Sequence, residues 1–288
     1  MSGMLAFAKR NVLCYLRDRA SVFFSLMAVF IVVMLYLLFL RNMLIDNFSS
    51  GMEFASLDQL SNLIDAWVLS GILGIVTVTT SAGSLNIMIE DKTNGRANDF
   101  AVTPMSNFEI AGGYVLSTFT VGMIMGAITL IFSVAYLMIT GCILDLTSVA
   151  ICACLLVPSA LSGSVIVYAL TSLLKSGGAF SGFFTVVSVL IGFLAGIYMP
   201  MGEMPDAMCF IGTLIPATQM ASLFRQQLCS GAMADVFGPY DASGFRVEMG
   251  FDLSLGGFEF TAVTSLVYVL VVTAAFAVFA VANVRKKR

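Results

Sequence analysis

The ionisable side chains of this 288-residue chain are suited to binding a partner and not to catalysis. Histidine, the commonest metal ligand and the usual general base near neutral pH, is absent. The six cysteines form no CxxC pair, and no GxxxxGKS or GxxxxGKT segment is present to hold a nucleotide phosphate. We therefore predict no catalytic residue, no metal ligand and no cofactor bound by the chain itself.

The densest group of charges occupies residues 90–109, between two apolar runs. Asn94 can cap one or two helical turns, which must end before Pro104 because a residue that precedes proline is disfavoured in helical geometry. Ser106 and Glu109 then have the spacing of a capping box, which opens a new helix. The pattern predicts a short rigid helix that can contact a partner; a plain solvated connector is the alternative. The charged residues of the segment are Glu90, Asp91, Lys92, Arg96, Asp99 and Glu109.

Residues 1–19 carry a second group of charges, on an amphipathic pattern. Apolar residues recur there at helical spacing, at Leu5, Ala8, Val12 and Leu16, and the basic residues fall on other faces. This pattern predicts a helix that lies on the membrane surface with its basic side near anionic headgroups. A charge cluster that only sets the orientation of the chain is the alternative. The basic residues are Lys9, Arg10, Arg17 and Arg19.

Composition decides the environment of these segments. Hydrophobic residues make up 59% of the chain and charged residues 11%, whereas a soluble domain carries roughly 25% charged residues. This number of charged residues is too small to form the surface of a soluble protein of this size. Lipid must therefore be part of its solvent. The net charge of −3 also excludes the basic surface of a nucleic-acid-binding protein.

Charge-free runs give the number of membrane crossings. A helix needs about 20 residues to cross a hydrocarbon core about 30 Å thick. Six runs reach that length, and a shorter run, residues 207–224, holds Pro216, Thr218 and Gln219. The six predicted transmembrane helices are residues 20–40, 66–89, 112–140, 146–174, 177–199 and 260–282.

The distribution of lysine and arginine orients the chain. With six crossings and both termini in the cytoplasm, inner segments hold 11 of the 14 basic residues, as the positive-inside rule requires. A seventh crossing would place the basic residues 285–288 outside. We therefore predict an all-α polytopic membrane protein with a single domain, residues 1–288. It has a cytoplasmic loop at residues 90–109, an outer re-entrant helical hairpin at residues 200–225 and an extracellular loop at residues 226–259.

Two features of the predicted crossings bear on mechanism. None contains Asp, Glu, Lys, Arg or His, although ion-coupled carriers use such groups within the membrane. Glycines also stand four residues apart at Gly122/Gly126, Gly178/Gly182 and Gly192/Gly196, a spacing that lets helices approach closely. Whether these pairs pack within one chain or between two chains stays open.

The segment at residues 90–109 resembles the corresponding loop of the type-2 ATP-binding-cassette (ABC) exporter permeases. In that family an acidic helix end is followed by a glycine and, nine residues later, by a proline that follows Thr or Ser. Here Glu90 and Asp91 precede Gly95, and Thr103-Pro104 lies at the matching distance. Glu109 and Gly113 also fit. The chain departs from the family at Arg96, Asn98 and Tyr114, where Thr, Glu and Lys are usual.

A second stretch resembles the outer segment of the same family. It comprises the run Gly196-Ile197-Tyr198-Met199-Pro200, then Pro205, Leu214-Ile215-Pro216 and Arg225. In the family this segment forms a broken re-entrant helical pair that caps the pathway. Arg17-Asp18-Arg19 is similar to the end of the family's connecting helix. The resemblance thus extends over nearly the whole chain in the expected order.

The resemblance implies the membrane subunit of an ATP-driven exporter in a bacterial plasma (inner) membrane. Its partners would be separate ATPase subunits, which hold ATP and Mg²⁺, and a second permease in a homodimer or heterodimer. The implied coupling residues are Glu90, Asp91, Lys92, Asn94, Gly95, Arg96, Thr103 and Pro104. The implied outer gate comprises Tyr198, Pro200, Pro205, Pro216 and Gln219.

An apolar pathway suits amphipathic cargo such as a drug, a lipid or a hydrophobic peptide, as in multidrug efflux. An ABC permease for a lipid-linked glycan is one alternative. An ion-coupled secondary transporter is another, and a membrane-embedded transferase is a third. The missing intramembrane charges argue against the ion-coupled transporter, and the missing histidine argues against the enzyme.

Overall fold

The computed structural model describes residues 3–49, 51–52, 54–174 and 176–286. Three basic residues that contribute to the predicted orientation, Lys175, Lys287 and Arg288, lie outside the described residues. Of Arg285 and Lys286 only the backbone is described.

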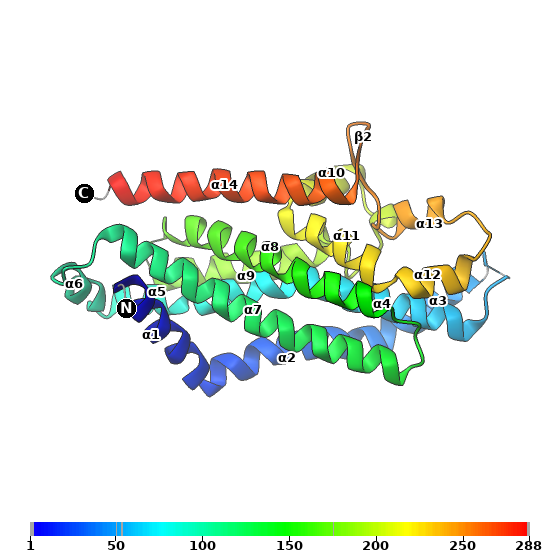
Figure 1. The fold of residues 1–288 in the computed structure, drawn as a ribbon, viewed down its shortest axis with the longest axis horizontal. Helices are drawn as coiled ribbons and strands as arrows, with labels where there is room; N and C mark the ends of the chain where they lie inside the picture. Colours follow the sequence, from blue (N-terminus) through cyan, green and yellow to red (C-terminus); the bar gives the residue numbers. More distant parts are fainter. Residues whose placement is uncertain (1–2, 50, 53, 175, 287–288) are drawn as a thin grey trace.

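The fold is a bundle of long helices that run side by side along one axis (Figure 1). In the described part of the chain, six helices are long and apolar enough to cross a membrane, which confirms the predicted all-α polytopic class. Both chain ends lie at the end of the bundle that carries α1 and α6, which we call the terminus end. The opposite end, with α3, α12 and α13, is the far end. The six helices are Phe30–Ser49, Leu57–Thr93, Asn107–Ile139, Leu146–Thr171, Gly177–Leu194 and Ala262–Val284.

The N-terminal helices form a bent arm. Helix α1, Gly3–Arg17, ends at Asp18, whose carboxylate accepts hydrogen bonds from the first amides of α2, Arg19–Leu35. The Ser21 hydroxyl and amide bind the same carboxylate and lower the pKa of Asp18. The chain continues through a π-helical turn, Tyr36–Leu40, into α3, Arg41–Ser49. Helical structure therefore extends nine residues beyond the predicted span 20–40.

The central helix is α4, Leu57–Ser84, which continues after a break at Leu85 as α5, Asn86–Thr93. Most residues of α4 are buried, because α7, α8 and α11 pack around it. A capping box of Ser56 and Gln59 starts α4 nine residues before the predicted span 66–89. Charge-free runs place the start at residue 66 because Asp65 precedes it, but Asp65 is buried inside the bundle.

Helices α6, Arg96–Ala101, and α7, Asn107–Ile139, follow the central helix. The predicted capping box of Ser106 and Glu109 is present at the start of α7. Asn94 does not cap the start of α6; it ends α5, and Gly95 begins α6. Gly95 has φ of +78°, a left-handed conformation that glycine adopts without strain, which explains the difference.

Helix α8, Leu146–Thr171, packs closely on α4 and α7 through glycines. A Cβ on Gly122 would lie 3.3 Å from Ser81 and 3.4 Å from Ala160. A Cβ on Gly126 would lie 2.9 Å from Leu156. The Gly122/Gly126 pair therefore packs within the chain. A Cβ on Gly178 or Gly182 of α9, Gly177–Leu194, would meet no described atom within 4 Å.

A broken helical pair follows α9. After a short 3₁₀ turn, Met201–Glu203, helix α10 spans Asp206–Leu214 and α11 spans Pro216–Leu228. The two helices are bent by 89° at the break, as expected for a broken span or a re-entrant loop. Pro216 occupies the first position of α11, where its missing N–H does no harm.

The segment after the pair, for which the sequence predicts a loop at residues 226–259, contains ordered structure. It holds α12, Ser230–Phe237, α13, Ser243–Glu248, and a hairpin of β1, Leu253–Leu255, with β2, Phe258–Phe260. Aromatic rings of Phe237, Phe245 and Phe251 stack in series there, and Phe48 of α3 joins them. Helix α14, Ala262–Lys286, then returns to the terminus end (Figure 1).

Candidate functional site

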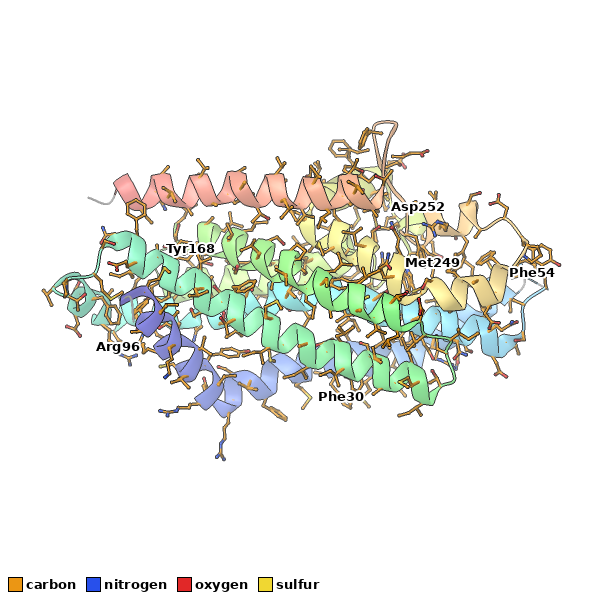
Figure 2. All side chains as sticks on the ribbon, in the orientation of Figure 1. Phe30, Phe54, Arg96, Tyr168, Met249 and Asp252 are labelled. Atoms are coloured by element: carbon orange, nitrogen blue, oxygen red, sulfur yellow. The ribbon has the colours of Figure 1, made fainter. Side chains whose placement is uncertain are left out.

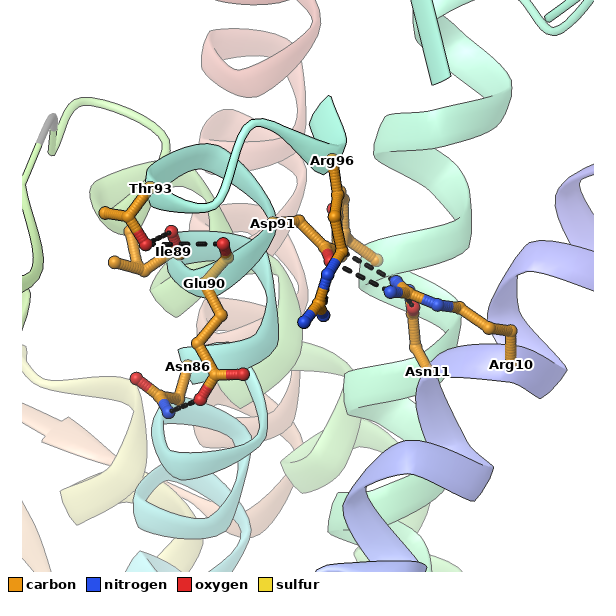
Figure 3. Close-up of polar contacts among 9 residues, drawn as sticks. Arg10, Asn11, Asn86, Ile89, Glu90, Asp91, Thr93 and Arg96 are labelled. Carbon is orange, nitrogen blue, oxygen red and sulfur yellow. Dashed lines mark hydrogen bonds and ion pairs between the residues drawn. The ribbon is translucent and has the colours of Figure 1, made fainter. Parts of the chain in front are cut away.

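Asp91 is the centre of a cluster that joins α1, α5, α6 and α7 at the terminus end. Its side chain is fully buried, and Arg10 donates to both of its oxygens, at 2.6 Å and 2.8 Å (Figure 3). The Tyr114 hydroxyl donates to Oδ2 at 2.9 Å, and the Arg96 guanidinium lies 3.5 Å from Oδ1. A buried carboxylate needs such partners, because desolvation is unfavourable for an unpaired charge. We call Asp91, Arg10, Tyr114 and Arg96 the Asp91 cluster.

Aromatic packing supports the Asp91 cluster. The ring of Phe7 on α1 meets Phe100 of α6 at 5.0 Å and Tyr114 of α7 at 4.9 Å, both edge to face. The Arg10 guanidinium lies 5.2 Å from the centre of the Phe100 ring, within cation–π range. Phe7 fits because α7 has Gly113 there; a Cβ would come within 2.6 Å of the ring. Helix α1 is therefore held to α6 and α7 by packing as well as by charge.

Arg10 carries its positive charge throughout the physiological pH range. Its hydrogen bonds to Asp91 raise the pKa of Arg10 above its already high ordinary value, against the opposing effect of burial. The side chain is 31% exposed, and it also donates to Asn11 at 2.9 Å. A guanidinium with these contacts stays protonated at any physiological pH.

The other residues predicted for coupling surround the Asp91 cluster at the surface. Glu90 is exposed and accepts a hydrogen bond from Asn86 at 2.7 Å (Figure 3). Lys92 is half-buried, with its Nζ 3.5 Å from the carbonyl of Leu174. The Thr103 hydroxyl caps the end of α6 by donating to the Phe100 carbonyl. Asn94 and Pro104 are exposed, as are Lys9, Arg17 and Arg19 of the N-terminal arm.

A second polar centre lies in the broken pair, at Arg225 of α11. Arg225 is fully buried, and it faces no carboxylate among the described residues. Its Nη2 donates to the carbonyls of Ala195 and Gly196 at 3.0 Å and 2.7 Å, and its guanidinium lies 4.9 Å from the centre of the Trp67 ring. Carbonyl oxygens and a π face thus replace water around the charge. Arg225 holds the end of α9 to α11 and to α4.

The predicted gate residues all lie around this pair. The Tyr198 ring packs on Phe193 and occupies the space beside Gly192, where a Cβ would be 2.4 Å from it. Gln219 is buried and donates to the Thr213 carbonyl at 2.8 Å, which bridges the break. Pro200 is buried, Pro205 precedes α10 and is exposed, and Pro216 begins α11.

Sequence reasoning missed a third centre, at Asp65 of α4. The Tyr36 hydroxyl donates to Oδ1 at 2.7 Å and Arg41 Nε donates to the same oxygen at 2.9 Å. The Tyr136 hydroxyl lies 3.4 Å from Oδ2. Because a π turn bonds residue i to residue i+5, Tyr36 and Arg41 come to the same side of their helix. Asp65 and Arg41 each border a predicted crossing, where a charge normally faces water, so the sequence did not indicate their contact.

Each of the three centres is a buried charged side chain held by partners from other helices. Among the described residues, no group of three or more Cys, Asp or Glu side chains is placed to hold a metal ion. Neither Asp65 nor Arg225 lies in one of the six predicted crossings, but the central helix begins at Leu57 and therefore includes Asp65. Asp65 forms an ion pair with Arg41, whose guanidinium does not release its proton.

Comparison with known families gives one result. The model of a family described as ABC-2 family transporter protein matches residues 45–282, which is most of the chain. The match covers the central helix, α6, the broken pair and α14. No curated protein matches the chain.

Proposed function

Because the chain belongs to the ABC-2 transporter family and is a membrane permease subunit of an ABC transporter, we propose that it exports a hydrophobic or amphipathic cargo. Such cargo would be a drug, a lipid or a peptide. Membership of the family implies association with an ATP-binding cassette ATPase subunit. ATP and Mg²⁺ then bind to that partner, and this chain provides the path.

The proposed location is a bacterial plasma membrane, with both termini in the cytoplasm. Two observations support this orientation. The described ends of the chain, in α1 and α14, lie at the same end of the bundle, as an even number of crossings requires (Figure 1). The basic residues are also concentrated in the segments at that end, as the positive-inside rule requires.

The proposed coupling route begins at α6. In this scheme the ATPase subunit contacts the exposed surface around Asn94, Asp99 and Thr103 and displaces α6 when it closes on nucleotide. The observation that carries the proposal is the Asp91 cluster, because it binds α6, α1 and α7 to a single buried carboxylate. A displacement of α6 would therefore move three helices together, including α7, which crosses the bundle.

The proposed gate is the broken pair α10–α11. Helix α4 touches it directly: a Cβ on Gly74 would lie only 2.6 Å from the Cα of Ala221 in α11. Arg225 and Gln219 keep the pair rigid, so it would shift as a unit when α4 moves. In this scheme the shift opens an apolar path past Tyr198.

We also propose that a second permease packs against this chain. Gly178 and Gly182 on α9 support this, because no described residue of the chain fills the space beside them. Small residues four apart allow another helix to approach closely. The partner would be a second copy or a related permease.

The test uses the complex of this chain with its ATPase subunit in proteoliposomes. Asp91→Asn should lower export of a fluorescent amphipathic dye per ATP hydrolysed at least fivefold, while the ATPase subunit still copurifies. Asp58→Asn is the matched control, because Asp58 is an exposed acid at the other end of the same central helix. Unchanged export in Asp91→Asn, or export without the ATPase subunit, would refute the proposal.

A further inference from the structure

A pocket of about 460 Å³ opens at the terminus end between α5, α6, α7, α8 and α14. Tyr168, which is labelled in Figure 2, lies on the wall of the pocket. It belongs to α8, which packs against both α7 and α14. Asp91 does not line this pocket, although Tyr114 contributes to both. Residues that define its walls include Met88, Lys92, Asn107, Tyr168, Asn283 and Val284.

The polar groups of the pocket suit an anion. Lys92 supplies a positive charge and Asn107 an amide, and no acidic side chain is among the described residues that line the walls. Tyr168 is only 6% exposed, yet its hydroxyl forms no hydrogen bond with a described residue. Because Tyr168 lines the pocket, its hydroxyl can donate a hydrogen bond to an anion that binds there. Asn283 donates to Ser172 at 2.9 Å and fixes α14 against α8 at the rim.

The pocket lies at the level of the bundle where lipid headgroups are expected. The apolar stretch of α14 ends at Val284, and the sequence continues with four basic residues. Helix α7 begins nearby at Asn107, directly after the polar segment 90–106. Basic residues that follow an apolar span are typical of the membrane–water interface. The pocket therefore lies where headgroups meet the protein.

A second, apolar recess lies on α14, one of the helices that line this pocket. It measures about 420 Å³ and is lined by Ala277, Val278, Val281 and Ala282. The alanines leave space between the valines, which hollows the helix surface. Val284, on the pocket wall, stands three residues after Val281 and seven after Ala277, so all three lie on one face of the helix. A polar pocket beside an apolar recess has the shape of a lipid head and the start of its acyl chain.

From these features we propose that the pocket binds the phosphate of an anionic phospholipid, whose acyl chain lies along the recess on α14. A phosphate monoanion matches the single charge of Lys92, and its oxygens accept from Tyr168 and Asn107. The bound lipid would bridge α6 and α14, two elements that are far apart in the sequence. The site requires neither the ATPase subunit nor transport.

The test measures lipid binding to the purified full chain in neutral detergent by native mass spectrometry. The probes are dioleoylphosphatidylglycerol, dioleoylphosphatidylcholine and inorganic phosphate. Phosphatidylglycerol should bind at least fivefold more tightly than phosphatidylcholine. Lys92→Gln and Tyr168→Phe should each weaken phosphatidylglycerol binding at least threefold. The matched controls, Arg246→Gln and Tyr240→Phe at the far end, should leave it unchanged.

Ala277→Leu, which fills the recess, should weaken binding of the dioleoyl lipid but not of a dihexanoyl analogue. Displacement of the lipid by millimolar inorganic phosphate would show that the pocket binds an anion, but it would overturn the proposal that this anion belongs to a lipid. Equal binding of both lipids, with no effect of Lys92→Gln or Tyr168→Phe, would overturn the proposal. Loss of bound lipid when the ATPase subunit joins would assign the pocket to that protein and overturn it as well.

Discussion

Arg10→Gln should release helix α1 from the bundle far more than Asp91→Asn, although the two substitutions break the same ion pair. The asymmetry follows from exposure: the Asp91 side chain is fully buried, whereas Arg10 is 31% exposed. Without Arg10, a buried carboxylate keeps only Tyr114 and the distant Arg96. Without the Asp91 charge, the Arg10 guanidinium can turn toward water.

The magnitudes follow from the same geometry. Removing one partner of a fully buried ion pair costs about 3–5 kcal/mol, and the partial exposure of Arg10 with the remaining Arg96 contact reduces this to about 2–3 kcal/mol. Asp91→Asn keeps the acceptor for Tyr114 and should cost about 1 kcal/mol. Since each 1.4 kcal/mol is a factor of ten, opening of α1 should rise roughly 30- to 140-fold in Arg10→Gln and about fivefold in Asp91→Asn.

Hydrogen–deuterium exchange of the amides in α1, in detergent micelles, measures this opening. Peptides from α12 at the far end serve as the internal reference, and their exchange should not change. The double variant Arg10→Gln/Asp91→Asn should exchange nearly as slowly as Asp91→Asn alone, because no buried charge remains. Equal exchange in the two single variants would show that Asp91 is not the residue that holds α1.

Other perturbations have equally direct outcomes. Gly74→Ala places a Cβ 2.6 Å from the Cα of Ala221 in α11 and should destabilise the protein by about 1–3 kcal/mol in a thermal unfolding assay. Gly244→Ala, whose Cβ would meet no described atom within 4 Å, should cost nothing. A normal melting temperature for the first variant would place α11 elsewhere. Arg225→Lys loses the two carbonyl bonds at the end of α9 and should cost about 2 kcal/mol, with faster proteolysis of the broken pair. A cysteine at exposed Asp206 should react with an impermeant thiol reagent in intact cells, and one at exposed Thr103 should react only after the cells are opened; the reverse pattern would invert the orientation.

The six long helices could be predicted because the length of a charge-free run is a local property of the sequence. Lipid thickness sets the required length, and no knowledge of neighbours is needed. The capping box of Ser106 and Glu109 is likewise local, since its two side chains bind backbone only three residues apart. The predicted cap at Asn94 was wrong for a related reason: Asn and Gly both suit helix starts, and only the fold shows which residue takes the left-handed turn.

The buried charges could not be predicted in the same way, because burial depends on which segments meet. Arg41 and Asp65 lie at the edges of two separate apolar runs, where a charge normally faces water. Their contact requires the π turn that brings Arg41 beside Tyr36, and no residue pattern in the chain indicates that turn. The contacts of Arg225 are even harder to predict from the sequence, because its partners are backbone carbonyls, which every residue carries.

The positions of Asp65 and Asp91 explain how one helix can connect the two ends of the bundle. The two residues are 26 positions apart on the central helix, about 39 Å at 1.5 Å per residue. Each is fully buried, and each is held by an arginine from the N-terminal arm and a tyrosine from α7. The arm and α7 are therefore fixed to the central helix at both of its ends. In the proposed scheme, a force on α6 would not be absorbed by sliding α1 alone and would be passed to α4, and Gly74 places α4 directly against α11.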